Sequence, residues 1–312
     1  DACFFGTNKV CPGFIGAVSK KARTVSSSYT LTALISPEII GKRLKQAKPV
    51  TKGIIHKTHI GLTTDKQQVE DALLAVMRNE HGLVSDKVFY SGSTRTRIEG
   101  REISLAITDH EYQRWLWFRK AQLGYQGVSL GHMEEESSFD KYHPFNPDIP
   151  LTHSLHQNEG AELNQAERQF RNAFDAGFRG IFYVVHASSP GTIDFLNEQR
   201  RKLKEKIHFP IVIEVTLRHL LLNTNAYNIH GNAVKVNPPL RYPQSQQAVF
   251  EKVLRGEVDI LATDHAPHPY ELKMSRNPPS GSAEIVAWPL AIEILKKEGI
   301  DKETLEKMLF HN

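Results

Sequence analysis

The feature that most constrains the fold is a repeated alternation of short apolar runs with longer segments of helical spacing. Eight apolar or β-branched runs occur, at 2–5, 29–35, 53–61, 85–90, 127–132, 180–186, 210–215 and 258–264. Segments with helical periodicity fall between them, at 37–48, 65–82, 164–180, 192–206 and 245–257. Strands that alternate with helices predict parallel βα units.

These units predict one closed barrel. Most of the predicted strands are apolar on both faces, as in a parallel sheet that is covered by helices. We therefore predict an α/β fold, a (β/α)₈ TIM-type barrel that spans residues 1–312 as a single domain. An open doubly wound sheet is the alternative. The polar, turn-rich segment 133–163 is expected to form a loop over the barrel mouth.

Charge and composition exclude several classes of partner. The 39 basic and 35 acidic residues are mixed along the chain, without a basic block, so we expect no nucleic-acid partner. No apolar run approaches the roughly 18 residues that a membrane helix needs, so we expect no membrane contact. Cys3 and Cys11 are the only cysteines and do not suggest a disulfide framework. The expectation is a soluble, cytoplasmic protein.

Four ionisable residues lie in or just after predicted strands: Lys87, His132, His186 and Asp264. Each alone is typical of a structural residue, although a charged lysine in a buried strand is costly unless it is paired or neutralised. A barrel would direct all four toward one mouth. Imidazole and carboxylate groups are zinc ligands, so the pattern suggests a hydrolytic metal site.

The sequence around these residues resembles that of the dihydroorotases, which belong to the amidohydrolase superfamily of metal-dependent (β/α)₈ barrels. Four stretches carry the resemblance: KVFYSGST (87–94), EVTLRHLLL (214–222), VKVNPPLR (234–241) and LATDHAPH (261–268). The resemblance implies the interconversion of dihydroorotate and N-carbamoyl-aspartate, a step of pyrimidine biosynthesis. A small β-sandwich usually flanks the barrel in that family, and we expect it to be absent from this chain.

The resemblance also implies roles for individual residues. Lys87 matches the lysine that the family carboxylates to bridge two zinc ions. His132 and His186 match ligands of the second metal. Asp264 matches the acid that ligates the first metal and carries the proton between water and the leaving nitrogen.

Two further residues match groups that bind the substrate in the family. These are Asn237, in VKVNPPLR, and His268, at the end of LATDHAPH. The implied ligand is a small cyclic amide that resembles dihydroorotate.

The beginning of the chain departs from the family pattern. The first strand of the family carries a histidine pair and an arginine, but Cys3, Phe5 and Thr7 stand at these positions. The second strand should end with an asparagine, which the segment 35–37 lacks. These changes remove ligands of the first metal. The resemblance therefore implies either one or two zinc ions. His56 and His59, on the third predicted strand, are candidate replacements, although strand residues that face helices or the rim are the more ordinary interpretation.

Three functions therefore remain open. The chain is a metal-dependent cyclic amidohydrolase of the dihydroorotase type, or a catalytically inactive pseudo-dihydroorotase that acts as a structural partner of aspartate transcarbamoylase. A hydantoinase or allantoinase type of enzyme is the third. The retained TDHAPH motif favours activity, whereas the loss of the first-strand residues favours the inactive form. A homodimer is compatible with all three.

We expect an acidic run and one further histidine to have no role in the site. We expect the acidic run Glu134–Glu136 to be a solvated face of a loop rather than a metal site. We expect His219, which precedes a run of leucines, to be a structural residue.

Overall fold

The computed structural model describes residues 35–47, 58–92, 95–98, 101–202 and 206–311. The predicted strand at 2–5 and nearly all of the one at 29–35 lie outside these residues. Residues Cys3, Phe5, Thr7 and His56 lie outside them as well.

The centre of the described fold is a parallel sheet of six strands, which are neighbours in chain order. They are β1 (Ile60–Gly61), β2 (Ser85–Phe89), β5 (Val128–His132), β6 (Ile181–Val184), β7 (Ile211–Thr216) and β8 (Ile260–Ala262). An open doubly wound sheet reverses its strand order at a switch point, whereas a barrel keeps chain order throughout. The order observed here is that of a (β/α)₈ barrel, as predicted.

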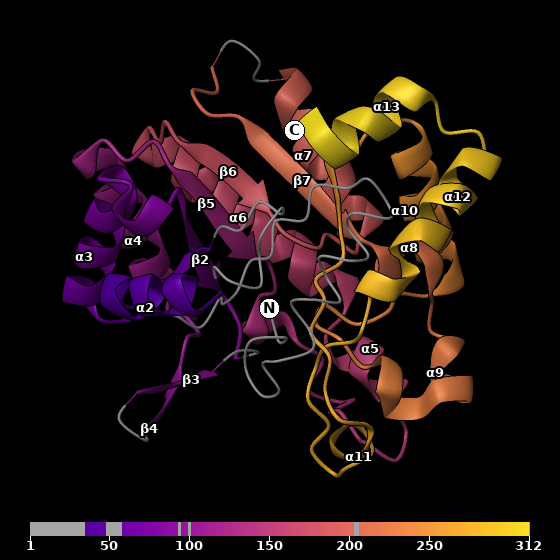
Figure 1. Ribbon diagram of the computed structural model, residues 1–312. Helices are drawn as coiled ribbons and strands as arrows, with labels where there is room; N and C mark the ends of the chain where they lie inside the picture. Colours follow the sequence, from indigo (N-terminus) through magenta and orange to yellow (C-terminus); the bar gives the residue numbers. More distant parts are fainter. Residues whose placement is uncertain (1–34, 48–57, 93–94, 99–100, 203–205, 312) are drawn as a thin grey trace.

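Helices cover the outer face of this sheet (Figure 1). The longer ones are α2 (Pro37–Ala47), α3 (Lys66–Met77), α4 (His110–Leu123), α6 (Glu159–Ala176), α7 (Pro190–Lys202), α10 (Pro243–Leu254) and α12 (Trp288–Lys297). Short helices are α5 (Thr152–His156), α8 (Leu217–Leu221), α9 (Ala226–His230), α11 (Tyr270–Lys273) and α13 (Lys302–Glu306). Single turns are η2 (Glu80–Gly82), η3 (Glu136–Ser138), η4 (Gly231–Val234), η5 (Ile285–Ala287) and η6 (Lys307–His311).

Local capping explains where several of these helices begin and end. The side chain of Asp65 accepts hydrogen bonds from the backbone N–H groups of Gln67 and Gln68 at the start of α3. Asp109 caps α4 in the same way, and Gly124 ends it in the left-handed conformation. The sequence prediction missed α4, although both of these signals were present.

An aromatic cluster fills the layer between the sheet and helices α4 and α6. The ring of Trp117 on α4 lies 4.9 Å from that of Phe178 and 5.5 Å from that of Phe182, between ring centroids. Phe170 on α6 and Phe209 join the same cluster. Burial of such large apolar side chains stabilises the fold by roughly 25 cal/mol per Å² removed from water.

A buried ion pair in the same outer layer shows which face of β2 points toward the helices. Asp86 faces outward and accepts a hydrogen bond from Lys120 Nζ on α4 at 2.7 Å. Successive side chains of a strand point to opposite faces. Lys87 therefore points to the other side of the sheet, into the barrel.

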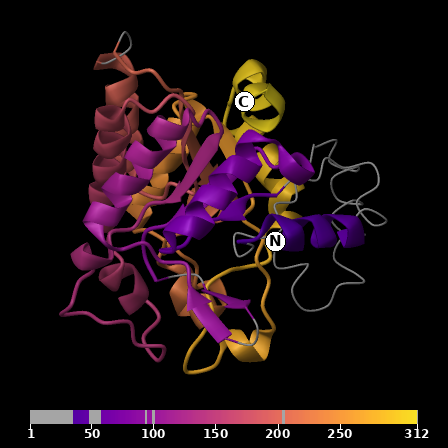
Figure 2. The same ribbon diagram turned by 90° about the vertical axis from the view of Figure 1, so that its left-hand side faces the viewer.

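The connections that follow the strands gather on one side of the sheet. The antiparallel hairpin of β3 (Arg95–Ile98) and β4 (Arg101–Ser104) follows β2. Figures 1 and 2 show this hairpin and α11 together at the lower side of both views. This side contains the carboxyl ends of the strands and is the barrel mouth. The prediction of a loop at 133–163 was only partly right, because this segment contains α5 and the start of α6.

The described residues contain no helix that is both long and apolar enough to span a membrane.

Candidate active site

The four ionisable residues predicted from the sequence all lie at or near the carboxyl ends of strands. Lys87 is within β2, and His132 is the last residue of β5. His186 and Asp264 each follow a strand by two residues, and their φ angles are 41° and 44°. Non-glycine residues rarely adopt this left-handed backbone conformation, and such strain concentrates at functional sites.

His132 and His186 face each other. His132 Nδ1 lies 2.9 Å from His186 Nε2, and both side chains are buried. His132 Nε2 lies 2.6 Å from the carboxylate of Glu134, an arrangement in which Nε2–H donates to Glu134 and Nδ1 accepts from His186 Nε2. Burial, with the nearby His132 and Lys87, lowers the pKa of His186 well below its usual value, so its ring is neutral. Imidazole binds a metal ion in its neutral form, and here one ring nitrogen of His132 faces one of His186.

Lys87 is a buried lysine without an ionic partner. Its residue is 4% exposed, and within the described part of the chain its Nζ makes no hydrogen bond or ion pair. Burial lowers its pKa to about 8, and the carboxylates of Glu214 and Asp264 act in the opposite direction. The nearest ring contact is with Phe89, whose centroid lies 5.3 Å from Nζ.

Asp264 is held by an arginine that the sequence did not single out. Arg218 Nη2 donates to the carbonyl oxygens of Thr263, at 2.9 Å, and Asp264, at 2.6 Å. It also lies 3.3 Å from the Asp264 carboxylate, whose side chain is 38% exposed. The second neighbour of the guanidinium is Glu284, 3.5 Å from Nε. A cation therefore already lies beside the acid at the end of β8.

Glu214, on β7, is a second acid at the centre of the site. Its carboxylate accepts hydrogen bonds from Tyr183 Oη, at 2.6 Å, and from the backbone N–H of His186, at 3.1 Å. Burial raises its pKa, while the bond from Tyr183 and the charge of Lys87 act against that rise. Both Glu214 and Arg218 lie within EVTLRHLLL, so the stretch was recognised from the sequence but these two contacts were not.

Asn237 and His268, the residues expected to bind substrate, meet at Ser280. Ser280 Oγ donates to Asn237 Oδ1 at 2.9 Å, and the carbonyl oxygen of Ser280 lies 3.0 Å from His268 Nε2. His153, on α5, places its Nε2 2.9 Å from Asn237 Oδ1. Helix α5 therefore packs against the NPPLR segment (237–241).

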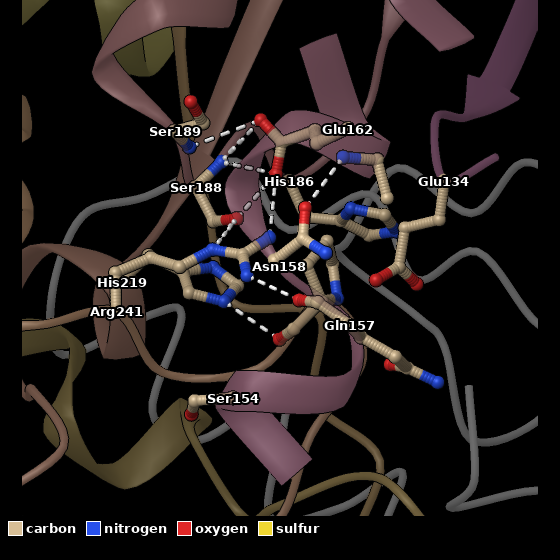
Figure 3. A network of polar contacts seen from close by, with 12 residues as sticks. Glu134, Ser154, Gln157, Asn158, Glu162, His186, Ser188, Ser189, His219 and Arg241 are labelled. Atoms are coloured by element: carbon tan, nitrogen blue, oxygen red, sulfur yellow. Dashed lines mark hydrogen bonds and ion pairs between the residues drawn. The ribbon is translucent and has the colours of Figure 1, made fainter. Parts of the chain in front are cut away.

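A polar network fixes the connection that follows His186 (Figure 3). Glu162, at the start of α6, accepts from the backbone N–H groups of Ser188, at 3.1 Å, and Ser189, at 3.0 Å. It also accepts from the Ser188 hydroxyl and from Arg241 Nη2. Arg241 in turn donates to the carbonyl oxygen of Gln157 at 2.5 Å. The arginine of NPPLR therefore ties together the ends of three segments around the histidine.

The acidic run Glu134–Glu136 differs from its prediction, whereas His219 agrees with it. The acidic run is not a solvated face: Glu134 is fully buried, Glu135 is buried against Arg168, and Glu136 alone is exposed. The expectation was wrong because a carboxylate at the end of β5 can be stabilised by the histidine and arginine around it. His219 is structural as expected, with Nδ1 2.8 Å from Thr216 Oγ1 and Nε2 2.9 Å from the carbonyl oxygen of Pro238.

His59 does not join the histidine pair. It is buried, and its Nδ1 lies 2.5 Å from Ser85 Oγ. Burial, aided by the charge of Lys87, lowers its pKa to about 3. This side chain lies at the amino-terminal end of β2 rather than at the mouth.

The donor set at the mouth fits one metal ion better than two. Ligand nitrogens of a tetrahedral zinc are about 3.3 Å apart, close to the 2.9 Å between His132 Nδ1 and His186 Nε2. Within the described ranges, no three histidine, cysteine, aspartate or glutamate residues are placed to share one ion. A third ligand would have to come from Lys87 in a modified form, or from residues outside these ranges.

Two open clefts are lined by residues of α4 and α6 and of the connections that follow β2 and β5. One, of about 570 Å³, reaches Tyr90 and Glu135 from the α4 side. The other, of about 430 Å³, lies between α4 and α6 and is lined by arginines and acids of both helices. Neither cleft includes the histidine pair, Lys87 or Asp264.

Parts of the chain are similar in sequence to known dihydroorotases. No protein-family model matches the chain. A dihydroorotase from Macrococcus caseolyticus is 34% identical over 121 residues, which are 38% of this chain and 27% of that protein. A dihydroorotase from Carboxydothermus hydrogenoformans is 39% identical over 109 residues, 34% of this chain and 25% of that protein. The matched segments thus span little more than a quarter of the length of these relatives.

Solved structures show the same fold. A dihydroorotase from Saccharomyces cerevisiae, in complex with 5-fluoroorotic acid, has a TM-score of 0.73 at 17% identity and covers 96% of this chain and 78% of that chain. A dihydropyrimidinase from Brevibacillus agri has a TM-score of 0.70 at 18% identity, over 95% and 64% of the two chains. Over the matched segments the chain is similar in sequence to dihydroorotases, and its fold is that of these solved structures.

Proposed function

We propose that this chain is a metal-dependent cyclic amidohydrolase of the dihydroorotase type, which interconverts dihydroorotate and N-carbamoyl-aspartate. The observation that carries the proposal is the convergence of His132 Nδ1 and His186 Nε2, 2.9 Å apart, at the strand ends that also contain Lys87 and Asp264. The sequence relationship to dihydroorotases supports the choice of substrate.

Each residue has a separate role in this proposal. His132 and His186 would hold zinc together with Lys87 in its carboxylated form. Bound zinc would act as a Lewis acid that polarises the ring amide carbonyl and makes a water molecule more acidic. Asp264 takes a proton from the attacking water and gives it to the ring nitrogen as the carbon–nitrogen bond breaks.

The surrounding residues orient this machinery. Glu134 accepts the Nε2–H of His132 and so keeps Nδ1 available as a ligand. Arg218 holds the Asp264 backbone and carboxylate in place. Asn237 and His268 lie together at Ser280, where they would bind the ring.

The Arg218–Asp264 contact also favours a second candidate. Because a guanidinium already balances the charge of this acid, Asp264 does not require a first metal ion. The same contact would persist in a catalytically inactive relative that serves as a structural partner, with aspartate transcarbamoylase as the partner to test.

Dihydroorotate hydrolysis by the zinc-supplemented protein distinguishes these candidates. We expect turnover that is abolished by a chelator and lowered about 10²- to 10⁴-fold in Asp264→Asn, the size typical of a lost general acid and base. Asp148→Asn, which alters an exposed carboxylate in the loop after β5, should leave the rate unchanged. An inactive wild-type protein that binds aspartate transcarbamoylase in sedimentation would instead support the second candidate.

A further inference from the structure

Lys235 is a buried ammonium group without a carboxylate partner. The residue is 8% exposed, and its Nζ donates to a single oxygen, Ser280 Oγ, at 2.8 Å. The other close group is the ring of Phe145, whose centroid lies 5.2 Å from Nζ. Among the described residues, no carboxylate comes within ion-pair distance of it. A buried charge is costly unless it is paired, so this position calls for an anion.

The lysine lies beside the residues expected to bind substrate. Ser280, the acceptor for Lys235, is also the donor to Asn237 Oδ1, and its carbonyl oxygen lies next to His268. Lys235, Asn237 and His268 therefore surround the same serine. Two further N–H groups of the ammonium remain available for a ligand bound there.

A second lysine stabilises this arrangement. Lys273 Nζ donates to the carbonyl oxygens of Lys235, at 2.6 Å, Pro279, at 2.9 Å, and Gly281, at 2.8 Å. These bonds join the segment before Asn237 to the loop that contains Ser280. The site is thus built from side chains with defined partners rather than from flexible surface residues.

Lys235 and Lys273 lie close enough for the charge of one to act on the other. Burial lowers the pKa of Lys235 to about 8, with Glu134 acting in the opposite direction. Burial lowers the pKa of Lys273 to about 7, and the positive charges of Lys235 and Arg218 lower it further. Arg218 is already balanced by Asp264 and Glu284, so the two lysines are the groups that would attract an entering anion.

We propose that Lys235 binds the negatively charged substituent of the ligand, a carboxylate attached to the cyclic amide. This inference rests on the proposed function, because it assigns a selectivity to the same mouth. Lys235 then determines that the ring must carry an acid group, while Asn237 and His268 contact the ring itself.

A matched pair of ligands tests the assignment without turnover. The probes are 5-fluoroorotate and 5-fluorouracil, which share the ring and differ in the carboxylate, and binding is followed by fluorine NMR on the zinc-supplemented full chain. We expect the wild-type protein to prefer 5-fluoroorotate. Lys235→Met should weaken 5-fluoroorotate about ten- to hundredfold, as for one lost charge-assisted hydrogen bond, and leave 5-fluorouracil within about twofold.

Two more variants make the result specific. Lys235→Arg keeps the positive charge and should retain part of the preference for 5-fluoroorotate. Lys252→Met removes an equally buried lysine on α10 that is paired with Asp194 and Glu257, and should leave both affinities unchanged. Thermal unfolding of each variant identifies any that fails to fold.

The outcomes separate the two proposals. Equal loss of both ligands in Lys235→Met, or a wild-type protein without preference for the carboxylate, would overturn the assignment of Lys235 and leave the amidohydrolase proposal standing. A folded wild-type protein that binds neither ligand would overturn both.

Discussion

At the scale of single residues, the site depends on the protonation state of histidines. Glu134 is buried and accepts a hydrogen bond from His132 Nε2–H, which leaves Nδ1 as the nitrogen that faces His186. The sequence placed both histidines at strand ends but assigned Glu134 to a solvated loop. A run of three acids gives no sign of which one turns inward, because that depends on the imidazole presented by the strand end.

Glu134→Gln tests this orientation. The amide cannot replace the carboxylate as a charged acceptor for His132, so we expect zinc affinity to fall by about 10- to 100-fold. Competition with a fluorescent chelator measures that affinity. Glu136→Gln is the matched control, because Glu136 is exposed and, among the residues that the structure describes, accepts one hydrogen bond, from the Gly92 N–H at 2.9 Å. Equal zinc affinity in both variants would show that Glu134 does not orient the ligand.

Buried histidines also predict how stability depends on pH. Burial lowers the pKa of His153 and of His219 to about 3, from an ordinary value near 6.5. The unfolded chain gains protons on these rings below about pH 6.5, whereas the folded chain does not until near pH 3. The free energy of unfolding should therefore fall as the pH drops from 6.5, by about 2 kcal/mol per histidine at pH 5. Urea unfolding at pH 7.5 and pH 5 measures this, and unchanged stability would contradict it.

At the scale of elements, the strand ends are held by contacts between connections. Glu162 on α6 fixes the backbone of Ser188 and Ser189, just after His186, and Arg241 after the NPPLR prolines donates to the Glu162 carboxylate. Sequence periodicity located α6 and the strand before His186, since both depend on local spacing. It could not reveal this network, because its members come together only when three connections pack at the barrel mouth.

Glu162→Gln should weaken this connection. Loss of a buried charge that accepts several hydrogen bonds should lower the free energy of unfolding by about 3 kcal/mol. Hydrogen exchange should become faster at the Ser188 and Ser189 amides in particular. Glu159→Gln, one turn earlier on the same helix and without such contacts in the described ranges, should change neither quantity. Uniformly faster exchange across the fold would indicate general destabilisation instead.

At the scale of the whole molecule, chain order and strand order coincide. Six of the eight predicted strands form one parallel sheet in that order, and this confirms the predicted barrel class. Alternating apolar runs were sufficient for that prediction, because each βα unit is specified locally. Lys87 and Glu214 are brought together by the curvature of the sheet from β2 to β7, which no local pattern specifies. The roles assigned to Lys87, His132, His186 and Asp264 stay predictions.

Zinc should stabilise the whole fold, since the ligands come from separate strands and meet only in the folded chain. An ion that binds only the folded state raises the free energy of unfolding by about 2.7 kcal/mol at 100 times its dissociation constant. Thermal unfolding across a zinc series should show a rising Tm in the wild-type protein and none in His186→Ala. An equal rise in both would place the zinc elsewhere.

The contact between His132 and His186 is the point on which the proposed function depends. The most direct measurement is anomalous X-ray scattering at the zinc edge from crystals grown with zinc. We expect a peak between His132 Nδ1 and His186 Nε2, about 2.0–2.1 Å from each nitrogen. Crystals in which the two nitrogens remain hydrogen-bonded to each other, with no peak between them, would contradict it.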